Sequence, residues 1–212
     1  RQTNVHWVVT DAFPNGGDLS RRFPPEDGLS DSYTFDGKEY GTRRVTGAGI
    51  YLRHFWSQWC TFPALFDNPS ENSTAYAYTW VYSPKSQNVG MLVEFQNYSR
   101  SANDVPPPTG CWDYRGSRIW LNDQELLPPD WTNAPDVRST EIDQGNENCT
   151  ARPPLSVHLD KGWNKVFMKL PIGQFTTPEI WLVKWMFTAV FVTPDGGQAV
   201  DGLVYSPDKT RH

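Results

Sequence analysis

One segment of the chain shows strict alternation between aromatic and smaller residues. Residues 74–82 read TAYAYTWVY, so every second side chain is a Tyr or a Trp. Successive side chains of a β-strand point to opposite faces, and a period of two therefore predicts a strand with one aromatic face. The residues of that face are Tyr76, Tyr78, Trp80 and Tyr82. Because the turn-forming sequence at 83–86 follows, we expect 89–95 to return as the hairpin partner of this strand.

Two further segments have the pattern of paired strands. Residues 117–121 and 124–127 flank an Asn-Asp dipeptide at 122–123. Asn and Asp tolerate the positive φ that a two-residue hairpin turn requires, so this segment predicts a tight hairpin. A second strand pair is expected at 157–159 and 166–170, on either side of a Lys-Gly turn.

The most apolar run of the sequence is 180–192. Its length would also suit a short helix. However, the run is rich in Trp, Phe, Val and Thr, and Pro178 and Pro194 flank it. These features favour a buried strand, with a bend or bulge to accommodate its length.

The composition extends this interpretation to the whole chain. β-branched and aromatic residues fit a pleated surface, and 16 Gly and 18 Pro interrupt nearly every window that could hold a long helix. Long irregular stretches lie at 11–38, 101–110 and 128–154, but their Trp and Tyr content argues against disorder. We therefore predict an all-β fold, an antiparallel β-sandwich or jelly roll with long loops. Since no clean linker is visible, residues 1–212 are expected to form a single domain.

Charge and hydropathy exclude two classes of protein. With 19 basic and 24 acidic side chains the net charge is −5, which argues against binding of nucleic acid through phosphate neutralisation. No stretch approaches the roughly 18 consecutive apolar residues of a membrane span. The sequence starts at Arg1 without a signal-peptide core, so we expect it to be a piece of a longer protein.

The potential metal ligands are dispersed. Cys60, Cys111 and Cys149 lie far apart without a C-x-x-C pair, and the four His residues are equally scattered, which argues against a zinc site. The cysteines are expected to be small buried residues, although a disulfide between two of them stays open. Loop carboxylates and carbonyls suit calcium, so a structural calcium ion is an alternative to the absence of any cofactor.

Catalytic signatures are absent from the sequence. There is no G-x-S-x-G, Walker A or H-E-x-x-H motif. The acidic residues Glu26, Asp27 and Glu94 could be offered as a carboxylate pair for glycoside hydrolysis, but no spacing relates them. Acidic side chains are mostly exposed, and we expect these to be solvated loop residues. No catalytic residue is predicted, and an independent hydrolase is the weakest hypothesis.

What remains to be explained is a surplus of 10 Trp, 9 Tyr and 11 Phe. Five tryptophans fall inside strand-like segments and are assigned to the core, namely Trp80, Trp120, Trp163, Trp181 and Trp185. Five aromatic residues fall in or beside loops with polar neighbours, namely Trp56, Trp59, Trp112, Tyr114 and Trp131. An exposed ring flanked by polar groups is complementary to a sugar, which has an apolar C–H face and a rim of hydroxyls.

The leading candidate for such a site is Trp112-Asp113-Tyr114-Arg115. Its two rings alternate with a carboxylate and a guanidinium that could bracket hydroxyl groups. The alternative is that these rings anchor long loops onto the sandwich, since Trp is highly buried on average. Trp56, Trp59 and Trp131 are secondary candidates.

Two short strings and five longer ones carry a resemblance to known proteins. The string KGWNKV at 161–166 and the hairpin RIWLNDQEL at 118–126 resemble signatures of the galactose-binding-like jelly roll. The longer strings lie at 47–54, 75–84, 94–101, 112–119 and 185–196. They resemble the non-catalytic C-terminal domain of bacterial family 20 glycoside hydrolases, the β-N-acetylhexosaminidases or putative chitobiases, and the likeness spans nearly the whole chain.

This resemblance implies an accessory module that is exported with its enzyme to the periplasm or the cell surface. The catalytic barrel of that family carries an Asp-Glu pair after a Gly-Gly turn, whereas here Gly16-Gly17-Asp18 is followed by Leu19. A barrel of about 250 residues also does not fit in this chain. No catalytic residue is carried over, and the parent protein is expected to be the enzyme.

Two functions follow from these observations. The first is binding of a glycan, for example one containing N-acetylhexosamine, through the loop aromatics. The second is a structural role, in which the module packs on the catalytic domain of the same polypeptide or mediates oligomerisation, because exposed aromatic patches also mark such interfaces.

Overall fold

The computed structural model describes residues 5–56, 65–66, 71–95, 107–130, 152–174 and 182–211. Within these residues the fold is all-β and contains no α-helix, as predicted. The strands are β1 (His6–Thr10), β2 (Phe13–Pro14), β3 (Tyr33–Phe35), β4 (Lys38–Tyr40), β5 (Thr42–Thr46), β6 (Gly49–Trp56), β7 (Ser73–Ser83), β8 (Gln87–Glu94), β9 (Arg118–Leu121), β10 (Gln124–Glu125), β11 (Leu155–Leu159), β12 (Gly162–Ile172), β13 (Leu182–Val192) and β14 (Val204–Ser206). A 3-10 turn, η1, spans Pro24–Glu26. No helix in the described part of the chain is long and apolar enough to cross a membrane.

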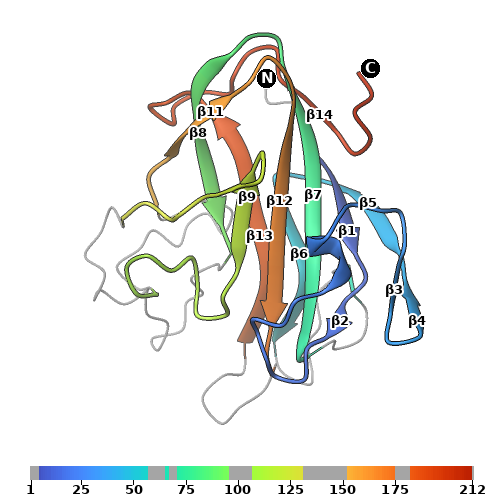
Figure 1. The fold of residues 1–212 in the computed structure, drawn as a ribbon. Coiled ribbons are helices and arrows are strands. Elements are labelled where there is room, and N and C mark those ends of the chain that lie inside the picture. Colours follow the sequence, from blue (N-terminus) through green and yellow to red (C-terminus); the bar gives the residue numbers. More distant parts are fainter. Residues whose placement is uncertain are drawn as a thin grey trace.

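The strands form two main antiparallel sheets that face each other (Figure 1). The eight-stranded sheet has the order β10-β9-β12-β7-β1-β5, and β2 and β14 also pair with β7. The second sheet has the order β11-β8-β13-β6, and β3 with β4 forms a separate hairpin. The predicted β-sandwich is therefore confirmed.

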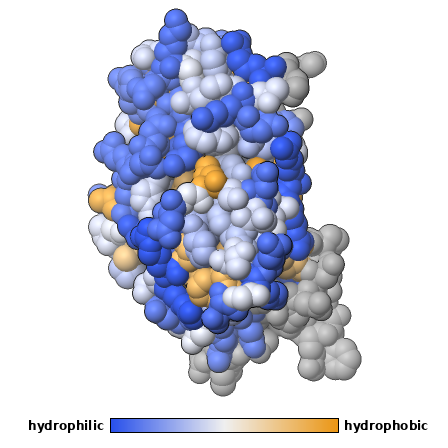
Figure 2. Space-filling model, turned by 45° about the vertical axis from the view of Figure 1, so that its right-hand side comes forward, coloured by the Kyte–Doolittle hydropathy of each residue, from blue (hydrophilic) through white to orange (hydrophobic). Residues whose placement is uncertain are grey.

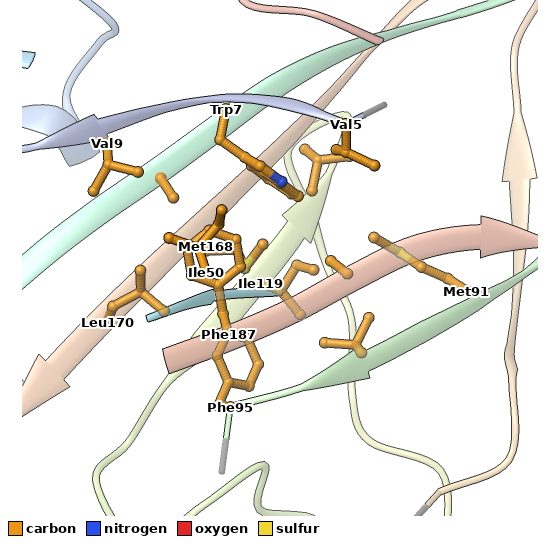
Figure 3. Close-up of a cluster of buried hydrophobic side chains, with 14 of the residues drawn as sticks. Val5, Trp7, Val9, Ile50, Met91, Phe95, Ile119, Met168, Leu170 and Phe187 are labelled. Carbon is orange, nitrogen blue, oxygen red and sulfur yellow. The ribbon is translucent and has the colours of Figure 1, made fainter. Parts of the chain in front are cut away.

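The core lies between the two sheets and follows the alternation of their strands. Inward-facing residues of β1, β12 and β13 meet there, including Trp7, Met168 and Phe187 (Figure 3). The rings of Trp7 and Phe187 meet edge to face with centroids 4.9 Å apart. The indole N–H of Trp7 donates to the carbonyl of Gly47 at 3.0 Å, so this buried polar group is satisfied.

Two local predictions are confirmed. The segment around residues 122–123 forms the hairpin of β9 and β10, with φ of 50° at Asn122 and 66° at Asp123. Both angles lie in the left-handed region, as a two-residue turn of type I′ requires. The apolar run near the C-terminus forms β13, whose pairing with β6 shifts register between Trp185 and Met186. This shift is the predicted irregularity.

Two predicted strand pairings are wrong. β7 pairs with β12 over its whole length, whereas β8 pairs with β11 and β13 in the other sheet. β11 and β12 are likewise separated between the two sheets. Both short connections therefore cross the sandwich instead of closing a hairpin. Loop length alone does not distinguish these two geometries, since each needs only a few residues.

The irregular stretch at the start of the chain has a defined structure on the outer face of the eight-stranded sheet. Residues 13–40, here called the strap, contain β2, η1, β3 and β4. Phe13, Phe23 and Tyr40 of the strap pack together, with centroid distances of 5.1 Å for Phe13–Phe23 and 4.4 Å for Phe13–Tyr40. They join a second hydrophobic cluster that includes Tyr76 and Phe167 of the sheet beneath.

Candidate functional site

The leading sequence candidate, residues 112–115, is here called the loop patch. Only one of its two rings is exposed in the structure. Trp112 is only 5% exposed, and its ring meets Phe95 edge to face with centroids 5.6 Å apart. Its indole N–H donates to the carbonyl of Leu126 at 3.0 Å, and the guanidinium of Arg152 lies 5.2 Å from its centroid. Trp112 therefore anchors its loop to the core, and its assignment as an exposed stacking platform is corrected.

Asp113 organises the turn that follows. Its Oδ1 accepts hydrogen bonds from the backbone N–H groups of Arg115 and Ser117, and its Oδ2 accepts from the Ser117 hydroxyl at 2.5 Å. The side chain is buried, so its acceptor sites serve the turn instead of a ligand. Tyr114, at 57% exposure, and the partly exposed Arg115 are what remains of the patch at the surface.

The other predicted loop residues are not placed by the structure. Trp59 and Trp131 lie outside the described residues, and Trp56 ends β6 with a side chain that is not described. Cys111 is free and exposed, so the expectation of a buried thiol is wrong for this residue, while Cys60 and Cys149 lie outside the described residues.

The tryptophans assigned to the core have different environments. Trp185 is buried as expected, and Trp181 lies outside the described residues. Trp80, Trp120 and Trp163 are only partly buried, because their strands present these side chains on the outer face of the eight-stranded sheet. Trp80 and Trp120 pack against the second hydrophobic cluster, so their assignment to the core holds in part, whereas Trp163 belongs to neither cluster and its assignment was wrong. We expected the exposed aromatic side chains in loops, but in the described residues a group of partly exposed rings lies on the outer face of the eight-stranded sheet.

Four side chains of β7 and β12 form this exposed surface, here called the open face. Strand register places Trp163 beside Tyr82 and Lys165 beside Trp80, and all four residues are partly exposed. The rings of Tyr82 and Trp163 meet edge to face at 5.5 Å. Figure 2 shows one side of the molecule, where hydrophobic residues occur only as small separate patches among polar ones.

Two exposed cations lie over the open face. The ammonium of Lys209 is 4.1 Å from the ring centroid of Trp80, and the guanidinium of Arg211 is 3.9 Å from that of Tyr82. Both residues belong to the segment after β14, which pairs with β7 beside these rings. Cations at these distances are attracted to the negative faces of the rings.

A compact turn holds this segment in place. The hydroxyl of the buried Ser206 accepts hydrogen bonds from the backbone N–H groups of Asp208 and Thr210 at 3.2 and 2.9 Å. Lys209 has a φ of 61°, in the left-handed region that non-glycine residues seldom adopt. Hydrogen bonds from Thr210 and Ser206, together with the charge of Arg44, hold the pKa of the Asp208 carboxyl below its usual range.

Two other cations near the open face, Lys165 and Arg44, are paired with carboxylates. Lys165 contacts Asp123 at 2.5 Å, and Arg44 contacts Asp208 at 3.4 Å. Lys209 and Arg211 make no ion pair with any carboxylate of the described residues. The open face therefore carries two cations that no carboxylate of the described residues pairs with, although the whole chain has a net charge of −5.

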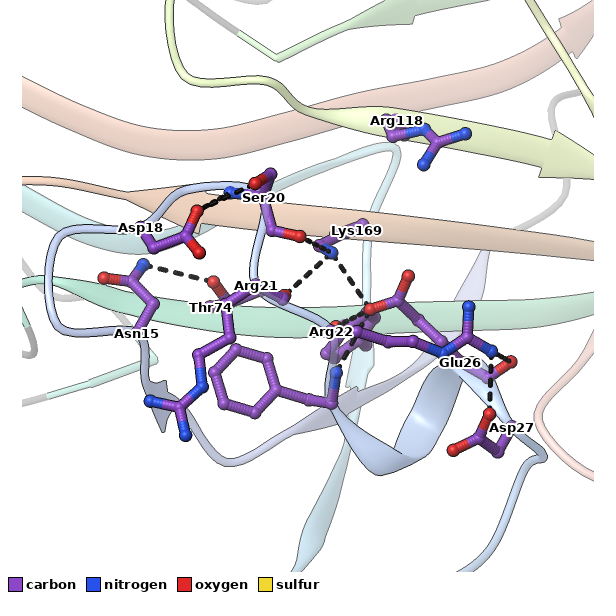
Figure 4. Close-up of polar contacts among 12 residues, drawn as sticks. Asn15, Asp18, Ser20, Arg21, Arg22, Glu26, Asp27, Thr74, Arg118 and Lys169 are labelled. Carbon is purple, nitrogen blue, oxygen red and sulfur yellow. Dashed lines mark hydrogen bonds and ion pairs between the residues drawn. The ribbon is translucent and has the colours of Figure 1, made fainter.

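The opposite half of the same sheet face is closed by the strap. Lys169 is buried with 4% of its side chain exposed, and its ammonium donates to Oε2 of Glu26 at 2.9 Å (Figure 4). It also donates to the carbonyls of Ser20 and Arg21, at 3.2 and 2.9 Å. The hydroxyl of Tyr76 donates to the same Glu26 oxygen at 2.5 Å. These bonds fasten the strap to β7 and β12.

The expectation that the acidic residues are solvated is wrong for two of them. Glu26 is 9% exposed in its ion pair, and Glu94 is 3% exposed. Val93 faces the core, so the alternation of β8 directs Glu94 to the outer face of the four-stranded sheet. Glu26 lies on the outer face of the other sheet, and stacked sheets are about 10 Å apart. The two carboxyl groups therefore have the whole sandwich between them and do not form a glycosidase pair, which needs about 5–9.5 Å.

The described residues contain no group of three or more His, Cys, Asp or Glu side chains placed to hold a metal ion. The expectation of a structural calcium ion has no residues assigned to it and stays a prediction. No protein-family model matches the sequence, and a search of curated proteins finds no significant match.

Sequence reasoning overlooked the residues that give the open face its charge. The alternation of Trp163, Lys165, Phe167 and Lys169 along one strand face was a usable signal for the lysine beside the rings. Lys209 and Arg211 carried no such signal, because their approach to the rings depends on the pairing of β14 with β7.

Proposed function

We propose that this chain is a non-catalytic module that binds carbohydrate, and that it does so through the open face of the eight-stranded sheet. The observation that carries this proposal is the grouping of three partly exposed aromatic side chains, Trp80, Tyr82 and Trp163, beside a lysine on one rigid surface. A sugar can stack its apolar C–H face on Trp163, the ring of this group that no cation covers among the described residues, while the polar and charged side chains beside Trp80 and Tyr82 hydrogen bond to its substituents.

The chemistry of the surroundings suits this role. Lys165 and Asp123 form an ion pair at the edge of the rings, and the Asp123 side chain is 81% exposed. Its carboxylate can accept hydrogen bonds from sugar hydroxyls, while the ammonium can donate to them. Because water hydrogen bonds are exchanged for protein ones with a small net gain, each site is expected to bind weakly.

The experiment is a titration of the chain with neutral and acidic hexosamine oligosaccharides, followed by tryptophan fluorescence and by NMR shifts. Trp163→Ala should weaken binding about two- to tenfold, since an aromatic contact contributes about 0.5–1.5 kcal/mol. Tyr114→Ala is the matched control, because it removes an exposed ring of the loop patch and leaves the open face intact. An effect of Tyr114→Ala alone would place the site on the loop, and the absence of binding to any glycan would refute the proposal.

A second candidate function is a structural one, in which the open face packs on a catalytic domain of the same polypeptide or on another copy of the chain. Trp, Tyr and Arg are the residues enriched at protein interfaces, and the open face with Arg211 contains all three. The resemblance to hexosaminidase accessory domains supports such a partner and a location in the periplasm or at the cell surface. Deletion of the module from the parent enzyme separates the two functions. Lost stability with unchanged glycan affinity favours packing, and impaired action on polymers alone favours binding.

A further inference from the structure

The two cations over the open face bear on which glycan the module recognises. Lys209 and Arg211 already cover the faces of Trp80 and Tyr82, at 4.1 and 3.9 Å from the ring centroids. A neutral sugar that stacks on either ring must first displace a cation and lose that attraction. A sugar with an anionic group can instead bind to the cations where they stand, and leave both ring contacts intact.

Hydrogen bonds within the segment hold the backbone that carries Lys209 and leads into Arg211. The buried Ser206 accepts from two backbone N–H groups, and its own hydroxyl donates to Asp208 at 2.9 Å. Lys209, at a φ of 61°, lies inside this turn. Because the backbone of this turn is ordered before the ligand arrives, less freedom is lost on binding, which favours affinity.

The spacing of the two cations also suits an oligosaccharide that carries more than one anionic group. Trp80 and Tyr82 are two residues apart on β7, so the rings beneath the cations are separated by about 7 Å along the strand. One oligosaccharide lying along β7 can therefore contact both cations. Lys165 lies beside Trp80 but is paired with Asp123, whereas Lys209 and Arg211, the cations over the rings, have no carboxylate partner among the described residues.

We propose that the open face selects glycans that carry carboxylate or sulfate groups, and that Lys209 and Arg211 are the residues that contact those groups. This inference rests on the proposed function and specifies its substrate class. Single-stranded nucleic acid also combines stacking with negative charge, but its binding depends on a groove of cations that follows the phosphate of every nucleotide, and the open face offers only Lys209 and Arg211 over its rings.

The test compares tetrasaccharides of equal length by calorimetric titration of the whole chain. The neutral probe is the N-acetylglucosamine tetramer, and the acidic probes are a hyaluronan tetrasaccharide, which carries carboxylates, and a chondroitin sulfate tetrasaccharide. We expect the acidic probes to bind at least about tenfold more tightly, as one charge-assisted hydrogen bond would give. Their affinity should fall as salt is raised, while that of the neutral probe should not change.

Two single variants locate the effect. Lys209→Gln and Arg211→Gln should each remove most of the preference for the acidic probes, because the acidic probes lose a cation contact and the neutral probe no longer has to displace a cation. Lys38→Gln is the matched control, because this exposed lysine also lies over a tyrosine ring, 5.3 Å from the centroid of Tyr40, but belongs to the strap. It should behave as the wild type.

Three results would overturn the inference. Equal affinity for neutral and acidic probes would contradict it and leave the proposed function standing. Equal affinity for a single-stranded oligonucleotide would show that the surface responds to charge without selecting a sugar. A complete lack of binding to every tetrasaccharide would refute the proposed function as well.

Discussion

The two halves of one sheet face contrast sharply, although the same two strands form them. In the covered half, Tyr76, Tyr78 and Phe167 are buried beneath the strap. In the open face, Tyr82 and Trp163 on the same strands remain partly exposed. Side chains alternate between the two faces of β7 and β12 in the same way in both halves. The difference in exposure therefore arises from the strap, which is distant in sequence from these strands. An aromatic strand face becomes core or surface according to what covers it.

Cations occur in both halves and have opposite roles. Lys169 is enclosed, with a carboxylate and two backbone carbonyls as its acceptors. Lys209 and Arg211 are exposed and rest on rings without a carboxylate partner among the described residues. A cation of the first kind fastens two parts of the fold, while cations of the second kind are free to meet a ligand.

The largest effect is expected from removing the enclosed cation. Lys169→Met leaves the Glu26 carboxylate buried without its ion-pair partner, and breaking a buried pair in this way costs about 3–5 kcal/mol of unfolding free energy. Urea denaturation measures this loss. Lys165→Met on the open face is the matched control, because its partner Asp123 is exposed and such pairs contribute about 0–1 kcal/mol.

A double variant sharpens this result. Replacing both partners, as in Lys169→Met with Glu26→Leu, also removes the buried carboxylate that would have no cation partner. The double variant should therefore recover most of the lost unfolding free energy. If the double variant is as unstable as Lys169→Met alone, the damage comes from lost packing of the strap, and the ion pair is not its cause.

The sequence predicted the fold class because alternation and turn chemistry are local properties. The β9–β10 hairpin and the irregular β13 both followed from residues within their own segments. The partners of β7 and β8 were not predictable in the same way, because a short connection can either close a hairpin or cross to the other sheet. Strand pairing is decided by the packing of the whole sandwich.

The site was harder to predict than the fold. An aromatic residue beside polar neighbours reads as an exposed ring, yet Trp112 reached the core because the carbonyl of Leu126 satisfies its indole N–H. Trp163 sits in a strand and reads as core, yet nothing in the described chain covers it as the strap covers Phe167. Exposure depends on contacts between distant segments, and these leave no pattern in a single stretch of sequence.

An intermediate effect is expected at alkaline pH, through the tyrosines of the covered half. Burial, with the hydrogen bond to Glu26 and its charge, raises the pKa of Tyr76 well above the usual 10.0, and burial raises the pKa of Tyr78 to about 12. The folded state thus keeps these protons at a pH where the unfolded chain has lost them. Stability is fully present below pH 10 and should fall as the pH rises above it.

Tyr76→Phe isolates the contribution of one tyrosine to this behaviour. At neutral pH the variant loses a hydrogen bond to a charged group, worth about 1.5–3 kcal/mol. Above pH 10 its unfolding free energy should decline less steeply than that of the wild type. Chemical denaturation across this pH range measures both quantities. Parallel curves for the two proteins would contradict the assignment of Tyr76 as a buried neutral phenol.

The smallest effect is expected from the exposed cation of the open face. Lys209→Gln removes one exposed cation–π contact with Trp80, which contributes about 0.5–1 kcal/mol. Urea denaturation should therefore place this variant close to the wild type and far above Lys169→Met. A loss as large as that of Lys169→Met would mean that the segment after β14 closes this half of the sheet as the strap closes the other. The contrast between the halves would then disappear, because Lys209 would stabilise the fold as Lys169 does. A ligand could not then bind to Lys209 without destabilising the segment around it.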